Sequence, residues 1–244
     1  MKHIWIEILL IMILLSGCST AENEVNLYTD EPYRVYLTPS LHPMWPAFQA
    51  CAAANPQAVY IFKERFYDQI GSADLIIRLG EPEELPAFAA ILAEEEIVVV
   101  LNGENSVTTL SKRQIQNIFH GAIDSWEEVG GQGEIRVWAL LEADEASQLF
   151  NKHILYPLRL TPYTRLAPDA EFLLQALQKD PNAIGYLPHA WVDENINTID
   201  VGIKVPVLVL ADEEPQGDLR QLVLCLQGEV GQKALSNFYL PIVE

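Results

Sequence analysis

Short apolar segments alternate with helical patterns along residues 33–234, and this alternation limits the possible folds more than any other feature. The clearest strand is predicted at Glu96–Leu101, because the run EIVVVL has the β-branched composition of a strand buried on both faces. A helix is predicted to begin after Ser111, where Ser111 and Gln114 match a capping box, and to end at Gly121. Strands that alternate with helices predict an α/β fold with mostly parallel sheets.

The same patterns place the remaining elements. Further strands are predicted at 33–37, 58–62, 74–78, 135–141, 183–187 and 205–210, and further helices at 41–54, 146–154, 168–179 and 218–234. Helix 168–179 is expected to turn Phe172, Leu173, Ala176 and Leu177 inward. The acidic run Glu94–Glu96 is interpreted as a solvated helix end.

Residues 1–17 have the pattern of a bacterial lipoprotein signal peptide. Lys2 precedes an apolar run that is short for a transmembrane helix, and Leu15-Ser16-Gly17-Cys18 reads as a lipobox. Cys18 is therefore the predicted lipidation site, and 18–26 is a polar tether. The alternative is an uncleaved N-terminal anchor. Both interpretations place the rest of the chain outside the cytoplasm, at the cell membrane.

The charge and the cysteines limit the partners and the chemistry. A net charge of −19 argues against nucleic acid and against electrostatic binding to anionic lipid headgroups. Cys51 and Cys225 each lie in an apolar helical pattern, so they are either two small buried residues or, in an oxidising compartment, a disulfide.

No pattern of residues indicates catalysis. The histidines lack metal-ligand spacing, and no nucleophile elbow, phosphate loop or dinucleotide fingerprint is present. Nothing in the sequence sets the separation of Glu142 and Glu145 to that of a hydrolase acid pair. We therefore expect no enzyme activity, no cofactor and no metal.

Several segments together resemble the phosphate-binding-protein-like solute receptors of ABC importers. The resemblance rests on LSKRQIQNIFHGAIDSWEEVGGQGEIRVWAL (110–140), PNAIGYLPHAW (181–191) and GEVGQKALSNFYLPI (228–242), with the lipobox and LTPSLHPMWPAFQACAAANP ahead of them. It implies a type 2 periplasmic-binding-protein fold, with two α/β lobes around a central cleft. Lobe 1 would comprise 27–101 and 200–244, and lobe 2 would comprise 102–199.

The resemblance also implies where a ligand would bind, and the sequence departs from it there. In the phosphate binders an arginine and a Ser-Gly-Thr turn, ahead of the helix that starts here near Ala146, hold the oxyanion. This chain has neither the arginine nor the glycine, and its turn carries Asp144 and Glu145. These acids would satisfy the helix N-terminus and repel a second anion. Only Ser147 remains there as a hydroxyl donor.

Other candidate ligand-binding residues lie earlier in the chain. Thr38, Ser40 and Leu41 begin the first helix, where hydroxyls and free N–H groups meet, although Thr38 or Ser40 could simply cap that helix. Arg78 could face the cleft or pair with an acid, and Asn102 lies at the expected first crossing between the lobes. Two tryptophans, Trp45 and Trp191, could line the cleft.

These features predict a lipid-anchored, extracytoplasmic solute-binding protein. It would serve an ABC permease as the receptor that closes around a small ligand, with a degenerate phosphate site. The acids favour a neutral or cationic ligand, or none. The alternative is a membrane-tethered sensor or interaction domain that has kept the fold and lost the ligand.

Overall fold

The computed structural model describes residues 31–240, so the predicted signal peptide 1–17, Cys18 and the tether 18–26 lie outside the described residues. The strands are β1 (Tyr33–Leu37), β2 (Tyr60–Glu64), β3 (Leu75–Leu79), β4 (Phe88–Asn102), β5 (Arg136–Leu140), β6 (Arg165–Ala167), β7 (Ala183–Pro188) and β8 (Ile196–Ala211). The α-helices are α2 (Trp45–Ala54), α3 (Lys112–His120), α4 (Glu145–Phe150), α5 (Ala170–Lys179), α6 (Gly217–Gln227) and α7 (Glu229–Leu235). Short helical turns are η1 (Pro39–Met44), η2 (Tyr67–Gln69), η3 (Trp126–Val129), η4 (Asn151–Leu155) and η5 (His189–Trp191).

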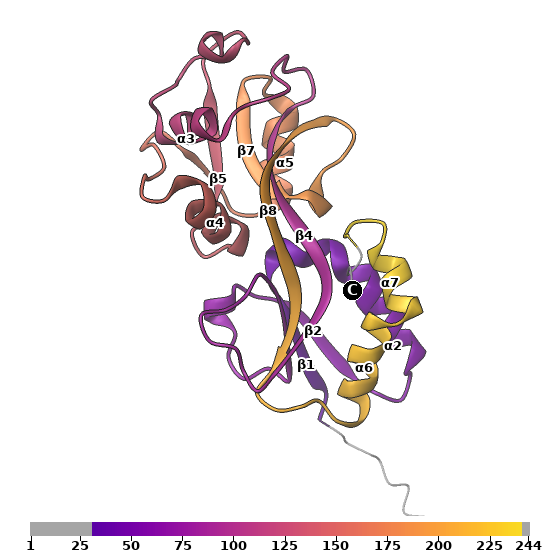
Figure 1. Cartoon of the computed structure of the whole chain (residues 1–244). Coiled ribbons are helices and arrows are strands. Elements are labelled where there is room, and N and C mark those ends of the chain that lie inside the picture. The colour runs from indigo at the N-terminus through magenta and orange to yellow at the C-terminus, as the bar shows by residue number, and fades with distance from the viewer. Residues whose placement is uncertain (1–30, 241–244) are drawn as a thin grey trace, which may run out of the picture. The chain divides into compact units, whose positions relative to one another are not determined.

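All eight strands belong to one mixed sheet, in the order β2-β1-β3-β8-β4-β7-β5-β6. The pairs at its two ends are parallel, as the α/β pattern predicted. The middle is antiparallel, because β8 pairs with β3 and β4, and β4 pairs with β7. The long strands β4 and β8 run side by side between the two ends of the sheet (Figure 1). This is the two-lobe α/β architecture, with β4 and β8 shared by both ends.

The interpretation of Glu94–Glu96 as a solvated helix end was wrong. These residues lie within β4, and Glu95 is only 2% exposed. Its carboxylate accepts hydrogen bonds from the backbone N–H groups of Glu96 at 2.7 Å and Ala190 at 3.4 Å. Burial raises the pKa of Glu95 to about 8, because the charged form loses its hydration. A tertiary contact with η5, which no local pattern reveals, explains the buried acid.

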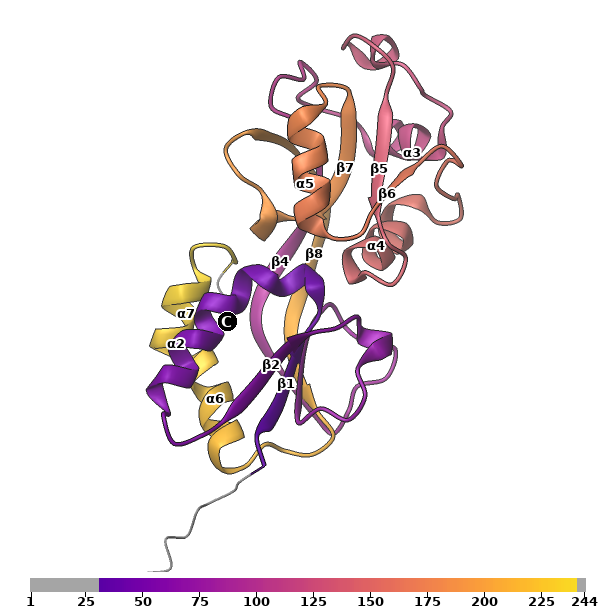
Figure 2. The ribbon, with the colours of Figure 1, turned by 180° about the vertical axis from the view of Figure 1, so that it is seen from behind.

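Helices from the two ends of the described chain pack together. Helix α2 contacts α6 and α7, and the three lie next to one another in both views (Figures 1 and 2). A disulfide joins Cys51 of α2 to Cys225 of α6, with the two Cα atoms 5.7 Å apart. Of the two alternatives for Cys51 and Cys225, two separate buried residues or a disulfide, the structure therefore contains the disulfide. The single helix predicted at 218–234 is divided at Gly228 into α6 and α7.

Local sequence signals predicted several elements well. Strand β1 has the predicted bounds, and α3 begins with the expected capping box between Ser111 and Gln114. Gly121 ends α3 in the left-handed conformation, with φ of 82°, which glycine adopts without strain. One prediction in helix α5 was wrong, since Phe172 is 46% exposed, whereas Leu173 and Leu177 are fully buried.

Candidate functional site

Three strand ends bring the candidate residues together. Thr38 and Ser40 follow β1, while Arg78 and Leu79 end the neighbouring parallel strand β3. The backbone N–H of Thr38 donates to the carbonyl of Ile77 at 3.0 Å, which fixes the end of β1 beside β3. The turn that carries Asp144 and Glu145 follows β5, which β8, β4 and β7 separate from β3 in the sheet.

The Glu145 carboxylate is held by donors from the segment that follows β1 and from the end of β3. Its Oε2 atom accepts a hydrogen bond from the Thr38 hydroxyl at 2.6 Å and from the Leu79 backbone N–H at 2.8 Å. The Nε atom of Arg78 lies 3.1 Å from the other oxygen, Oε1. A hydroxyl, a backbone amide and a guanidinium therefore converge on one carboxylate, as such groups converge on a bound oxyanion.

Asp144 makes a second set of contacts across the same region. Its Oδ1 atom accepts a hydrogen bond from the Ser40 hydroxyl at 2.7 Å, and also from the backbone N–H of Ala146 at 2.9 Å. The second bond is an N-cap for α4, as the acids of this turn were expected to provide. The first bond ties this turn to the segment after β1.

Both acids are buried, which makes their charge costly. Asp144 and Glu145 are each 3% exposed. Burial raises the pKa of both carboxyls, that of Glu145 to about 7, whereas Arg78, Thr38 and the Leu79 amide act in the opposite direction on Glu145. The Arg78 guanidinium compensates the Glu145 charge, whereas Asp144 is held by the Ser40 hydroxyl and by backbone N–H groups.

Arg78 is also fixed from its other side. The Arg78 guanidinium carbon lies 4.1 Å from the centre of the Tyr67 ring, in cation–π geometry, and the residue is 6% exposed. A cavity of about 580 Å³ beside this group is lined by Tyr67, Arg78, Leu79 and Glu145, and also by Lys152 and Glu81. Solvent can therefore approach the ion pair from this cavity.

The hydroxyls of Thr38 and Ser40, predicted to bind a ligand or to cap a helix, contact acids of the turn after β5. Thr38 is the N-cap residue of η1, yet its side chain makes no capping bond. Instead, Thr38 and Ser40 donate to Glu145 and Asp144. The indole N–H of Trp191 donates to the Ser40 carbonyl at 2.8 Å, so Trp191 helps to hold this segment.

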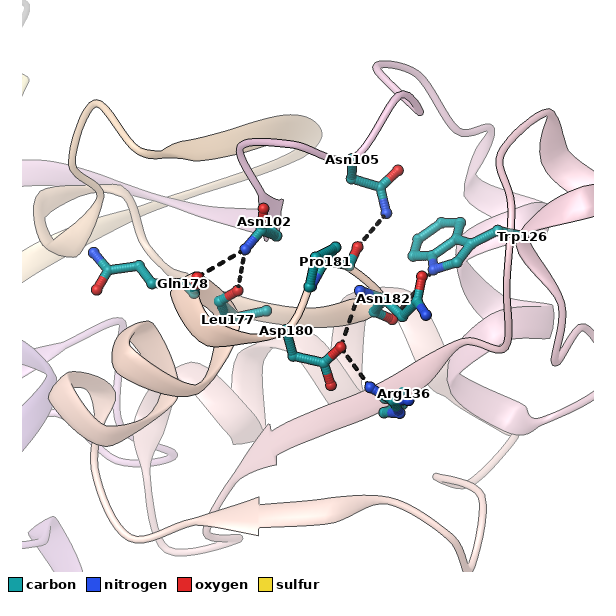
Figure 3. A network of polar contacts seen from close by, with 9 residues as sticks. All are labelled: Asn102, Asn105, Trp126, Arg136, Leu177, Gln178, Asp180, Pro181 and Asn182. Atoms are coloured by element: carbon teal, nitrogen blue, oxygen red, sulfur yellow. Dashed lines mark hydrogen bonds and ion pairs between the residues drawn. The ribbon is translucent and has the colours of Figure 1, made fainter.

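The other three predicted ligand-binding residues, Leu41, Asn102 and Ser147, make different contacts. Leu41 is fully buried in the core, and its N–H donates to the Thr38 carbonyl. The Ser147 hydroxyl lies 2.9 Å from the Tyr186 hydroxyl. Figure 3 shows that the Asn102 side chain bonds the carbonyls of Leu177 and Gln178 at the end of α5. Through these two hydrogen bonds, Asn102 at the end of β4 anchors the C-terminal end of α5.

The sequence pattern did not point to the Leu79 backbone amide, because a backbone donor has no residue signature. It predicted that Asp144 and Glu145 satisfy the helix N-terminus and repel an anion, but it did not predict their contacts with Thr38, Ser40 and Arg78. One signal could have revealed these contacts: Asp144 and Glu145 stand where the resemblance predicts a turn with glycine. An acidic side chain at that position lies within reach of the Thr38 and Leu79 donors.

Neither a metal site nor a membrane-spanning helix occurs in the described part of the chain. Within residues 31–240, no three His, Cys, Asp or Glu side chains are grouped so that they could hold a metal ion. Over the same range, every helix is too short or too polar to cross a membrane.

Comparison with solved structures identifies the fold. The chain superposes on a candidate phosphate ABC transporter substrate-binding protein with bound phosphate from Clostridium perfringens, with a TM-score of 0.78 and 18% identity, over 87% of this chain and 100% of the other. An ABC-type phosphate transport receptor from Vibrio cholerae gives 0.70 and 16% identity over 86% and 100%. The OxyR regulatory domain of Pseudomonas aeruginosa, in its reduced form, gives 0.58 and 12% identity over 80% and 97%.

The sequence itself gives a weaker similarity. No model of a known protein family matches it. The phosphate-binding protein PstS of Bacillus subtilis is 27% identical over 145 residues, which are 56% of this chain and 46% of that protein. The matched part thus spans less than half of the curated relative. The chain has the two-lobe type 2 periplasmic-binding-protein fold of the phosphate receptors, as the sequence motifs implied.

Proposed function

We propose that this chain is an extracytoplasmic solute-binding protein, anchored by a lipid on Cys18, that serves an ABC permease as its receptor. It acts by binding and carries out no catalysis. The fold it shares with two phosphate transport proteins supports this role. The lobe limits 27–101 with 200–244 and 102–199 belong to the same proposal, with β4 and β8 as the hinge between the lobes.

In this proposal, the position where the phosphate receptors hold phosphate is degenerate in this chain. One observation carries this part of the proposal: the Glu145 carboxylate already accepts hydrogen bonds from the Thr38 hydroxyl and the Leu79 amide, and it forms an ion pair with Arg78. Incoming phosphate would have to displace that carboxylate while Asp144 remains nearby, and like charges about 4 Å apart repel by roughly 1 kcal/mol in bulk water and roughly 4 kcal/mol near a protein surface. We therefore expect the physiological ligand to be neutral or cationic.

Calorimetric titration of residues 19–244 with inorganic phosphate at moderate salt tests this function. The expected result is no binding in the micromolar range. Micromolar or tighter binding would show that phosphate displaces the Glu145 carboxylate, and the protein would then be a phosphate receptor.

A second candidate function has one observation in its favour. The hydrogen bonds from Thr38 and Ser40 and the ion pair from Arg78 to the turn after β5 join distant parts of the sheet through the chain's own side chains. Such contacts suit a tethered sensor or interaction domain, and a regulatory domain has the same fold. Neighbouring genes separate the two candidates, since permease and ATPase genes favour the receptor and a regulator or envelope-assembly gene favours the sensor.

A further inference from the structure

The geometry points to a built-in ligand: we propose that the Glu145 side chain fills an oxyanion-binding site formed by Thr38, Arg78 and the Leu79 amide, and that removing it opens this site to small inorganic oxyanions. This inference rests on the proposed function and names the residue responsible for the degenerate phosphate position. Glu145 would thereby determine which solutes the protein excludes.

All three groups that hold the Glu145 carboxylate are donors. The backbone amide and the guanidinium can only donate, and the Thr38 hydroxyl donates to the same carboxylate. A buried ion pair needs only the carboxylate and the guanidinium. Two further donors on the same group, from two different segments, make a set that would bind an anion whether or not the anion is covalently attached.

The side chains that donate to Glu145 are also buried. Thr38 is 1% exposed and Arg78 is 6% exposed, so neither donor can readily turn to bulk solvent if Glu145 is lost. Buried donors without acceptors are unfavourable. A glutamate-free site would therefore attract water or a free anion, and the guanidinium would favour the anion.

Without the Glu145 side chain, the site would have room for phosphate and access from solvent. Changing glutamate to glycine removes as many non-hydrogen atoms as inorganic phosphate contains. The cavity of about 580 Å³ that is lined by Arg78, Leu79 and Glu145 provides a route from solvent.

Nearby charges set limits on the affinity. Lys152 lines the cavity and favours an anion, whereas Glu81, Glu83 and Glu84 line it and oppose one. Asp144 lies next to the site, and its carboxylate is bonded to Ser40. The charge of Asp144 should weaken phosphate binding, so Asp144→Asn should strengthen binding in the variant that lacks the Glu145 side chain.

The test is calorimetric titration of phosphate, with sulfate as a second probe, into wild-type residues 19–244, Glu145→Gly and Glu145→Gln. The glutamine variant is the matched control, because it removes the charge and keeps the atoms that fill the site. We expect at least tenfold tighter phosphate binding by Glu145→Gly than by Glu145→Gln or the wild type. Adding Thr38→Val to Glu145→Gly should abolish the gain.

The outcomes separate this inference from the proposed function. If the wild type binds phosphate at micromolar concentrations, the degenerate phosphate position of the proposed function is refuted. If the wild type and a folded Glu145→Gly both fail to bind, only the built-in ligand is refuted. If Glu145→Gly does not fold in buffer, the proposal requires phosphate to restore its folding, and the absence of such rescue for both Glu145→Gly and Glu145→Ala overturns it.

Discussion

Replacing Arg78 by methionine measures how strongly the buried Glu145 carboxylate depends on the guanidinium. Methionine keeps much of the side-chain length and removes the charge that lies 3.1 Å from Glu145 Oε1. Removing one partner of a buried ion pair costs roughly 3–5 kcal/mol, because the other charge stays buried and unpaired. Thr38 and the Leu79 amide still stabilise the carboxylate, so we expect the lower end, about 3 kcal/mol.

The pH dependence of this cost has a defined sign. Burial already raises the pKa of Glu145 to about 7, and Arg78 is the main group that lowers it. Without Arg78 the carboxyl should take up a proton at higher pH, which relieves the unpaired charge. The destabilisation by Arg78→Met should therefore be larger at pH 8 than at pH 5.

Urea unfolding, followed by tryptophan fluorescence at both pH values, gives these free energies. The control is Arg78→Met in the Glu145→Gln background, where the change should cost about 2 kcal/mol less, within the coupling range of contacting residues. Equal costs in the two backgrounds would mean that Arg78 does not compensate Glu145. That result would refute the description of the site as a self-occupied anion site.

Three further predictions concern other parts of the chain. Removing the Cys51–Cys225 disulfide opens a loop with a sequence separation of 174, for which chain entropy predicts about 5 kcal/mol of lost stability, and unfolding with and without reductant measures it. The pKa of Glu95 is raised to about 8, so folded protein retains this proton and the unfolding free energy should fall as pH rises from about 5 to 8. Glu95→Gln should reduce that slope, and an unchanged slope would contradict the assignment. Cys18→Ala should release the protein from the membrane in cell fractionation, and unchanged processing and membrane binding would argue against the lipoprotein.

The fold was largely predictable because its signals are local or motif-based. The capping box at Ser111 and the apolar run of β1 act through neighbouring residues, and the segment motifs implied the two-lobe fold. The length of β4 was not predictable, since the acid at Glu95 interrupts the apolar pattern and is buried only through contacts with η5. Sequence alone also left the disulfide undecided, because pairing depends on how α2 meets α6.

The candidate site was predictable only in part. Thr38, Ser40 and Arg78 were identified by their positions at the ends of predicted elements, and the structure joins all three to one turn. The inward direction of the Glu145 side chain has no local cause, since an acid in the first turn of a helix is usually solvated. Donors from the segment that follows β1 and from the end of β3 decide its direction, and they lie 107 and 66 residues away in the sequence.

A crystal structure of wild-type residues 19–244, grown at a high phosphate concentration, shows directly which acceptor the Thr38 hydroxyl and the Leu79 amide bind. We predict that the Glu145 carboxylate remains bonded to the Thr38 hydroxyl and the Leu79 amide, with no phosphate between them. Phosphate density at that position, with the Glu145 side chain turned away, would contradict the account.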